Sequence, residues 1–104
     1  MISSLEKLLG TPRDGALLRF SLGLEYAKAG EHERAIEFLR DAVTRDAQYS
    51  AAWKALGGEL AKAGRDDEAL EAYRQGIEAA QKKGDRQAEK EMTVFARRLE
   101  KKKG

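Results

Sequence analysis

The sequence predicts an all-α protein made of antiparallel helix–turn–helix repeats, and two observations carry this prediction. Residues 22–30 match residues 56–64 at seven positions, and residues 35–40 match residues 69–74 at three more, all at one offset of 34 residues. Apolar residues recur every three or four positions, whereas β-branched residues are scarce and never alternate. A fixed period of this length indicates stacked repeats, each of which buries its apolar face against its neighbours.

About six helices are expected, and four of them begin at a recognisable signal. Their expected ranges are about 3–10, 14–29, 32–45, 50–63, 66–82 and 85–101. The run Ser3–Glu6 fits a capping box for the first helix. Thr11 or Asp14 is expected to cap the second, Asp66 or Arg65 begins the fifth, and Asp85 caps the sixth.

Glycines are expected to end four of these helices. Gly30 and Gly64 each follow a Lys-Ala pair at the end of an amphipathic run, and Gly10 and Gly84 occupy similar places. A residue just past a helix often adopts the left-handed conformation, which glycine accepts without steric cost. These four glycines therefore separate the predicted helices.

The composition excludes several classes of protein. Charged residues form 37% of the chain, but the net charge is only +2, unlike the one-sided charge of a dedicated nucleic-acid binder. There is no cysteine, hence no disulfide or thiolate metal site, and no cofactor is expected. The N-terminus lacks the pattern of a secretory signal, and no apolar run approaches the roughly 20 residues of a membrane span. A cytoplasmic location is therefore expected.

Catalytic and metal-binding signals are weak. His32 is the only histidine, and it is interpreted as a solvated turn residue between two glutamates. The acidic run Asp66–Glu68 begins a predicted helix, where it complements the helix dipole. No phosphate-binding glycine loop and no nucleophile–histidine–acid set is evident, so the chain is not expected to be an enzyme.

The repeated residues resemble a known family. The second copy carries Trp53, Leu56, Gly57 and Leu60, followed by Ala69, Tyr73 and Gly76, and the first copy carries Leu22, Gly23 and Tyr26, followed by Ala35, Leu39 and Ala42. This pattern resembles the tetratricopeptide repeat. In the first copy Arg19 replaces the tryptophan of the family pattern, and Ala47 stands where a proline is common.

The resemblance implies a short right-handed superhelix and a division of the chain. Residues 1–15 would form an N-terminal half-repeat, 16–49 and 50–83 the two repeats, and 84–104 a capping helix. Within each repeat the two helices would cross at Gly23 or Gly57, because a missing side chain lets the backbones approach closely.

The family also implies a concave groove lined by the first helix of each pair. The residues expected there are Phe20, Leu24, Ala27, Lys28, Lys54, Ala55, Gly58, Ala61, Lys62, Met92, Phe95 and Ala96. The three lysines would give the groove a cationic rim that suits an extended or helical peptide with apolar anchors and some acidic character. The alternative is that Phe20 and Leu24 pack against the first or last helix and fill the groove. Binding of a terminal carboxylate through paired lysine and asparagine is not expected, since the chain contains no asparagine.

The leading functional prediction is a non-catalytic adaptor that binds a peptide or helix of a partner protein. One alternative is a self-assembling structural unit, with the chain a monomer or a weak homodimer. Another is weak binding of nucleic acid or an anionic surface by the basic residues of 97–103. A solvated helix end is the simpler interpretation of those residues, because cations suit the C-terminus of a helix.

Overall fold

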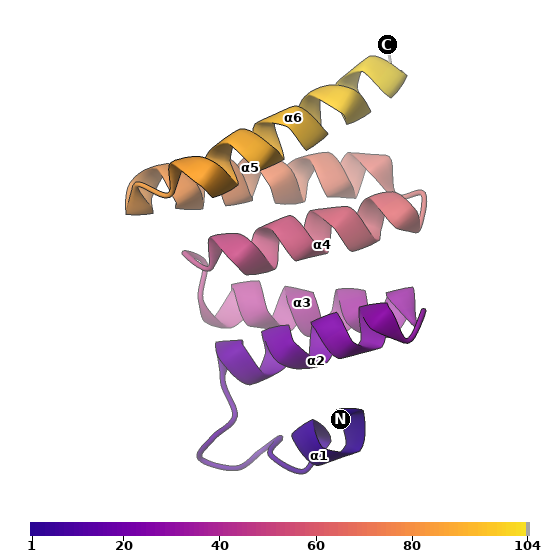
Figure 1. Ribbon diagram of the computed structural model, residues 1–104, viewed down its shortest axis with the longest axis vertical. Helices are drawn as coiled ribbons and strands as arrows, with labels where there is room; N and C mark the ends of the chain where they lie inside the picture. Colours follow the sequence, from indigo (N-terminus) through magenta and orange to yellow (C-terminus); the bar gives the residue numbers. More distant parts are fainter. Residues whose placement is uncertain (104) are drawn as a thin grey trace.

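The computed structural model describes residues 1–103, and this part of the chain holds six helices and no strand (Figure 1). The helices are α1 (Ile2–Glu6), α2 (Ala16–Lys28), α3 (His32–Arg45), α4 (Ser50–Lys62), α5 (Asp66–Lys83) and α6 (Arg86–Lys103). The all-α prediction is therefore confirmed. Of these six helices, none combines the length and the apolar character that a membrane crossing needs.

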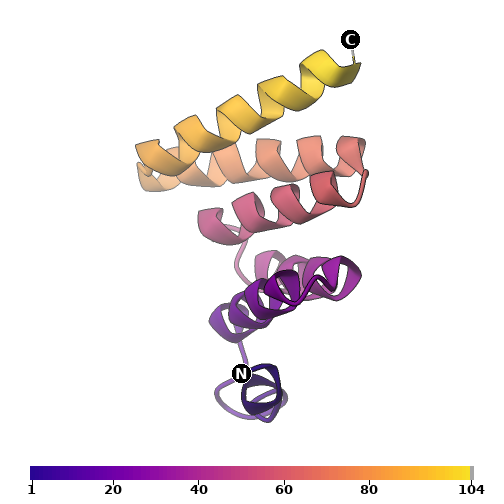
Figure 2. The same ribbon diagram turned by 45° about the vertical axis from the view of Figure 1, so that its right-hand side comes forward.

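The helices stack in sequence order along the long axis of a 43 × 29 × 18 Å molecule. Helices α2, α4 and α6 form the nearer layer in Figure 1, and α3 and α5 form the layer behind them. The view turned by 45° shows the same order, with α1 at one end and α6 at the other (Figure 2). Each hairpin packs on the next, as expected of a repeat array.

Apolar residues at helical spacing fill the interior of this stack. The larger core cluster joins α3 to α6, and a smaller one joins α2 and α3 to the half-buried leucines of residues 5–9. The largest completely buried side chains are Leu22, Leu39, Leu56, Leu60 and Met92. Neighbouring hairpins thus supply the cover that one hairpin lacks.

The predicted glycine crossings are confirmed. A Cβ atom added to Gly23 would lie 2.7 Å from the Leu39 side chain, and one added to Gly57 would lie 2.5 Å from the Tyr73 ring. Real Cβ atoms do not approach other atoms so closely, so only glycine allows the two helices of each repeat to meet at these distances. Gly76 plays the same part against Met92 and Trp53.

Two predictions of helix starts are wrong. The first helix covers only Ile2–Glu6 and has no side-chain cap, so Ser3 and Glu6 form no capping box. Helix α2 begins after Gly15, and neither Thr11 nor Asp14 caps it. The cap predicted for α6 is confirmed, since the backbone N–H of Ala88 donates to Asp85 Oδ1 at 3.1 Å.

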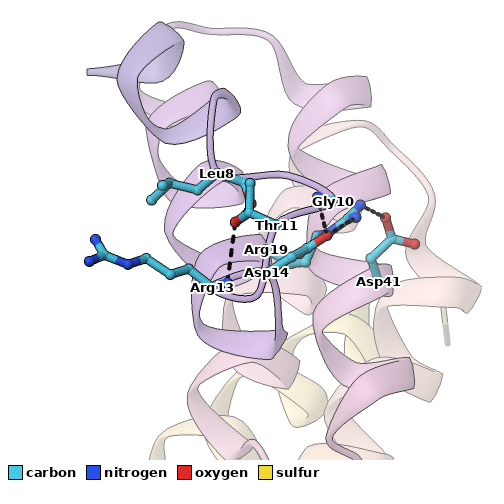
Figure 3. A network of polar contacts seen from close by, with 7 residues as sticks. All are labelled: Leu8, Gly10, Thr11, Arg13, Asp14, Arg19 and Asp41. Atoms are coloured by element: carbon cyan, nitrogen blue, oxygen red, sulfur yellow. Dashed lines mark hydrogen bonds and ion pairs between the residues drawn. The ribbon is translucent and has the colours of Figure 1, made fainter.

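Asp14 instead closes a network that holds the segment before α2 (Figure 3). The Arg19 guanidinium donates to both Asp14 oxygens at 3.0 and 2.9 Å and to Asp41 Oδ2 of α3 at 2.9 Å. Asp14 also accepts the backbone N–H of Gly10 at 2.9 Å. A single arginine thus joins the N-terminal segment to both helices of the first repeat.

The four glycines predicted at helix ends all have φ between 74° and 79°. Gly84, for example, directly follows α5 in the left-handed conformation. Any other residue there would be strained. Gly30, Gly64 and Gly84 follow the ends of α2, α4 and α5 as predicted, whereas the prediction for Gly10 is wrong, because α1 already ends at Glu6.

Candidate functional site

A first hollow lies between α2 and α4, and α3 supplies part of its floor. It measures about 380 Å³ and is lined by Leu24, Ala27, Lys28, Leu39, Ala55, Gly58, Glu59 and Lys62. Six of these residues belong to the predicted groove, namely Leu24, Ala27, Lys28, Ala55, Gly58 and Lys62. All eight come from α2, α3 and α4, so neither α1 nor α6 contributes to its lining.

A second, smaller hollow of about 170 Å³ lies where α4, α5 and α6 meet. Its lining residues are Ala61, Tyr73, Phe95, Arg98 and Leu99, of which Ala61 and Phe95 belong to the predicted groove. The Tyr73 and Phe95 rings pack at a centroid distance of 5.7 Å, and the Arg98 guanidinium lies 5.9 Å from the centre of the Phe95 ring. Helix α6 therefore adds an aromatic wall and a cation.

Gly58 belongs to α4 between these two hollows. A Cβ atom added there would meet only Tyr73 Oη, at an ordinary contact distance of 3.8 Å. Packing therefore does not require glycine here, in contrast to Gly23 and Gly57. Since glycine inside a helix costs about 1 kcal/mol relative to alanine, the bare backbone at this point needs another explanation. We call the two hollows together with Gly58 the groove surface.

Two predicted groove residues are wrongly placed by the sequence, and two more, Phe20 and Lys54, line neither hollow. Met92 is completely buried with its sulfur against Gly76, and Ala96 is only 8% exposed, so both belong to the core of α6. The Phe20 ring packs against Tyr49, just before α4, with ring centroids 4.9 Å apart and ring planes tilted by 48°. The alternative that Phe20 packs against the first or last helix is wrong too.

The prediction of a cationic rim is also wrong, because each of the three lysines is paired with a glutamate. Lys28 lies 3.2 Å from Glu25, Lys62 lies 3.2 Å from Glu59, and Lys54 lies 2.6 Å from Glu91 of α6. The hydrogen bond from Lys54 holds the pKa of the Glu91 carboxyl below its usual value. The lysines therefore give the groove no excess positive charge.

Glu59 is a site residue that the sequence reasoning missed. It is 5% exposed, and its Oε1 lies 2.6 Å from Nδ1 of His32, the first residue of α3. His32 is therefore a partner of Glu59 and not merely a solvated turn residue. The sequence did hold a signal for Glu59: it lies 34 residues after Glu25, so it is part of the repeat, and the predicted groove residues Gly58 and Ala61 are close to it in the chain. This contact joins the two repeats at the first hollow.

The C-terminal lysines were expected to be solvated, yet two of them have partners. Lys102 lies 3.2 Å from Asp66, and Lys103 pairs with Asp67, both in the first turn of α5. The end of α6 therefore neutralises the acidic start of α5. This contact explains part of the basic run at residues 97–103 without any ligand.

A comparison with known proteins decides the family. A profile of the tetratricopeptide repeat matches residues 16–49. A TPR repeat-containing protein of Pseudomonas aeruginosa is 50% identical over 100 residues, which cover 96% of this chain and 95% of that protein. The chain belongs to the tetratricopeptide repeat family. Proteins of this family generally mediate protein–protein interactions.

Solved structures of other tetratricopeptide repeat proteins show how far this likeness extends. A protein of Bordetella parapertussis is 41% identical, with a TM-score of 0.82 over 98% of this chain and 89% of that chain. A tetratricopeptide repeat domain protein of Salinibacter ruber is 26% identical, with a TM-score of 0.78 over 84% of this chain and 97% of that chain. Nearly the whole fold is therefore shared with the Bordetella protein, and the larger part of it with the Salinibacter protein.

Proposed function

We propose that this tetratricopeptide repeat protein is a non-catalytic adaptor that binds a segment of a partner protein along the groove surface. The observation that carries the proposal is Gly58, whose backbone lies bare between two hollows. A ligand backbone can approach a helix closely only where no side chain intervenes. The cost of this glycine is then offset by binding, since packing gives no reason for it.

The chemistry of the two hollows suggests what such a segment carries. The first hollow offers Leu24, Ala27 and Ala55 beside paired charges, which suits an apolar side chain. The second offers Phe95 and Leu99 beside Arg98, which has no carboxylate within 4.0 Å among residues 1–103. Any preference for an acidic partner would therefore come from Arg98 and not from the three lysines.

A charge placed in the groove tests the proposal. We expect Leu24→Glu and Ala61→Glu each to abolish capture of a cellular partner by the tagged protein, because a carboxylate would be buried in an apolar contact. Leu17→Glu is the matched control: it changes another leucine of α2, one that is 69% exposed and lines neither hollow. Far-UV circular dichroism checks that all three variants remain helical.

Two results would contradict the groove. One is capture by Leu24→Glu at the level of the unaltered protein, and the other is an equal loss in Leu17→Glu. Partners found by capture would then be titrated against labelled protein, with chemical-shift mapping to locate the contact. Chemical-shift changes confined to residues outside the groove surface would also exclude the groove as the binding site.

The remaining sequence-based expectations stay predictions with their own tests. Light scattering at high micromolar concentration distinguishes a monomer from the self-assembling unit. Cell fractionation tests the cytoplasmic location. Nucleic-acid binding by the C-terminus, if present, must weaken steeply between low and moderate salt.

A further inference from the structure

The outer face of α6 differs from the equivalent faces of α2 and α4. In α2 and α4 the glycines Gly23 and Gly57 face the second helix of the repeat, against Leu39 and Tyr73. Helix α6 begins at Arg86, 36 residues after Ser50 begins α4, so Thr93 holds the position equivalent to Gly57. Around Thr93, the residues Arg86, Lys90 and Val94 are exposed. In α2 and α4 a second helix follows and packs beside the first, whereas no helix of the described chain covers this side of α6 (Figures 1 and 2).

This uncovered face is hollowed and carries one exposed apolar side chain at its edge. A shallow depression of about 660 Å³ is lined by Arg86, Glu89, Lys90, Thr93, Val94 and Arg97. Val94 is 45% exposed, one of the few large apolar side chains of the molecule that face solvent. The depression lies along one helix and is distinct from the groove surface, with which it shares no residue.

The cations of this face have no internal partners. Every lysine and arginine of α2 and α4 lies within 4.0 Å of a carboxylate. On the outer face of α6, four cations have no such partner among residues 1–103. We call them the basic ridge: Arg86, Lys90, Arg97 and Lys101. Two of the three α6 carboxylates pair with cations elsewhere, Glu91 with Lys54 and Glu100 with Arg74, and Glu89 accepts a hydrogen bond from Gln81.

The spacing of the basic ridge gives it a definite shape. Its members are four, seven and four residues apart, which places them within an arc of about 60° and along about 22 Å of one helix. The same spacing is obtained when it is read from either end. A partner helix with carboxylates at this spacing could therefore pair with the ridge in either direction.

We infer that the outer face of α6 docks an acidic amphipathic helix of a partner protein, whose carboxylates meet the basic ridge and whose apolar side chain covers Val94. The partner helix takes the place beside α6 that α3 takes beside α2 and α5 takes beside α4. A protein helix fits better than nucleic acid, because the exposed Val94 side chain offers an apolar contact that a phosphate backbone does not use. This surface acts independently of the proposed groove.

The test uses the full chain and two synthetic alanine-based helical peptides of equal composition. In the matched peptide four glutamates have the spacing of the basic ridge, with one leucine at the centre of the same face. In the control peptide the same residues are distributed around the helix. We expect the matched peptide to bind about fivefold more tightly, as a set of aligned exposed charge pairs would give.

Charge-reversed variants locate the contact. We expect the triple variant R86E/K90E/R97E to weaken binding of the matched peptide about tenfold or more. The control variant K7E/R13E/R45E alters the net charge equally at exposed sites in the first half of the chain, and we expect it to bind within about twofold of the unaltered chain. If the reversal unfolds α6, R86Q/K90Q/R97Q replaces it.

Several outcomes would overturn the inference. Equal affinity for the two peptides would show a response to charge alone. An equal loss of affinity in K7E/R13E/R45E, or chemical-shift changes on the groove surface instead of α6, would exclude the basic ridge as the binding site. The face would be assigned to nucleic acid if a short single-stranded DNA bound more tightly than the matched peptide and if R86E/K90E/R97E abolished that binding.

Discussion

The two repeats of this protein place different side chains at equivalent positions. Where the helices of the first repeat meet, Tyr26 stands on α2 and Leu39 on α3, whereas the second repeat has Leu60 on α4 and Tyr73 on α5. The large ring thus changes sides between the repeats, with one tyrosine and one leucine in each. Total volume, more than residue identity, is what the crossing of two helices requires.

The repeats also differ in how the first helix is anchored. In the second repeat Trp53 donates its indole N–H to the carbonyl of Ala47 at 2.9 Å. In the first repeat Arg19 occupies that position and uses ion pairs with Asp14 and Asp41. A neutral hydrogen bond in the second repeat and two salt bridges in the first anchor the first helix of the repeat. Only the salt bridges, which we call the ionic anchor, depend on pH.

The largest expected difference concerns the two crossing glycines. Gly57→Ala would force a Cβ atom against three atoms of the nearly buried Tyr73 ring, and Gly23→Ala would force one against the branched end of Leu39. We expect Gly57→Ala to lower the free energy of unfolding by about 2 kcal/mol and Gly23→Ala by about 1 kcal/mol, after the gain in helix propensity. Urea denaturation of both variants measures the difference.

The reason for this order is that the Cβ atom at position 57 would meet three ring atoms of Tyr73, the nearest at 2.5 Å, whereas the one at position 23 would meet two atoms of Leu39 at 2.7 Å. If Gly23→Ala lowered the free energy of unfolding as much as Gly57→Ala or more, the two helix crossings would not differ in this way. The Gly57→Ala protein should remain helical, because the substitution favours helix locally.

The features that sequence reasoning predicted are those encoded within one repeat. The period of 34 residues located the crossing glycines, and the terminal glycines located the helix ends, because each depends on its own conformation or its nearest partner. These parts of the fold follow from local rules that hold for every copy of the repeat.

The features that it missed depend on contacts between repeats or at the ends of the array. Lys54 pairs with Glu91, and His32 with Glu59, across spacings of 37 and 27 residues that no pattern within a repeat contains. Met92 was assigned to the groove because α6 lacks the Leu-Gly pair that sets the phase of α2 and α4. The side of α6 that is buried is the one on which Met92 packs against Gly76, and the 34-residue pattern does not predict this contact.

A smaller effect is expected from acid on the ionic anchor of the first repeat. The Arg19 guanidinium holds the pKa of the Asp14 carboxyl far below its ordinary value of 3.8. A lowered pKa in the folded state means that this interaction stabilises the protein fully above about pH 4 and is lost as the pH falls below that value. We expect Asp14→Asn to be less stable at neutral pH and to lose less stability on acidification.

The measurement compares urea midpoints at about pH 7 and about pH 3 for the unaltered protein and Asp14→Asn. Glu68 and Glu91 also have lowered pKa values, so both proteins will weaken in acid, and only the difference between them reports on Asp14. Trp53→Phe is the control from the second repeat, since it removes a hydrogen bond without a titrating group. An identical acid response in Asp14→Asn and the unaltered protein would contradict the ionic anchor.

The smallest expected change concerns Leu24 and Gly58, which occupy the same position of the two repeats. Leu24 is 37% exposed and presents a side chain to the first hollow, while Gly58 presents only backbone. We expect Gly58→Ala to raise the free energy of unfolding by up to about 1 kcal/mol, because alanine favours helix and its methyl group would meet Tyr73 Oη without strain. The same substitution should weaken partner capture, since the methyl group would stand where a ligand backbone approaches.

The opposite signs of these two effects distinguish binding from packing as the reason for the glycine. A stabilised Gly58→Ala protein that still captures its partner would show that the bare backbone has no role in binding. A destabilised one would show that the helix needs glycine there for its own packing. Leu24→Ala is the companion variant: its stability should change by no more than about 0.5 kcal/mol, because the side chain is exposed, while capture should weaken through loss of an apolar contact.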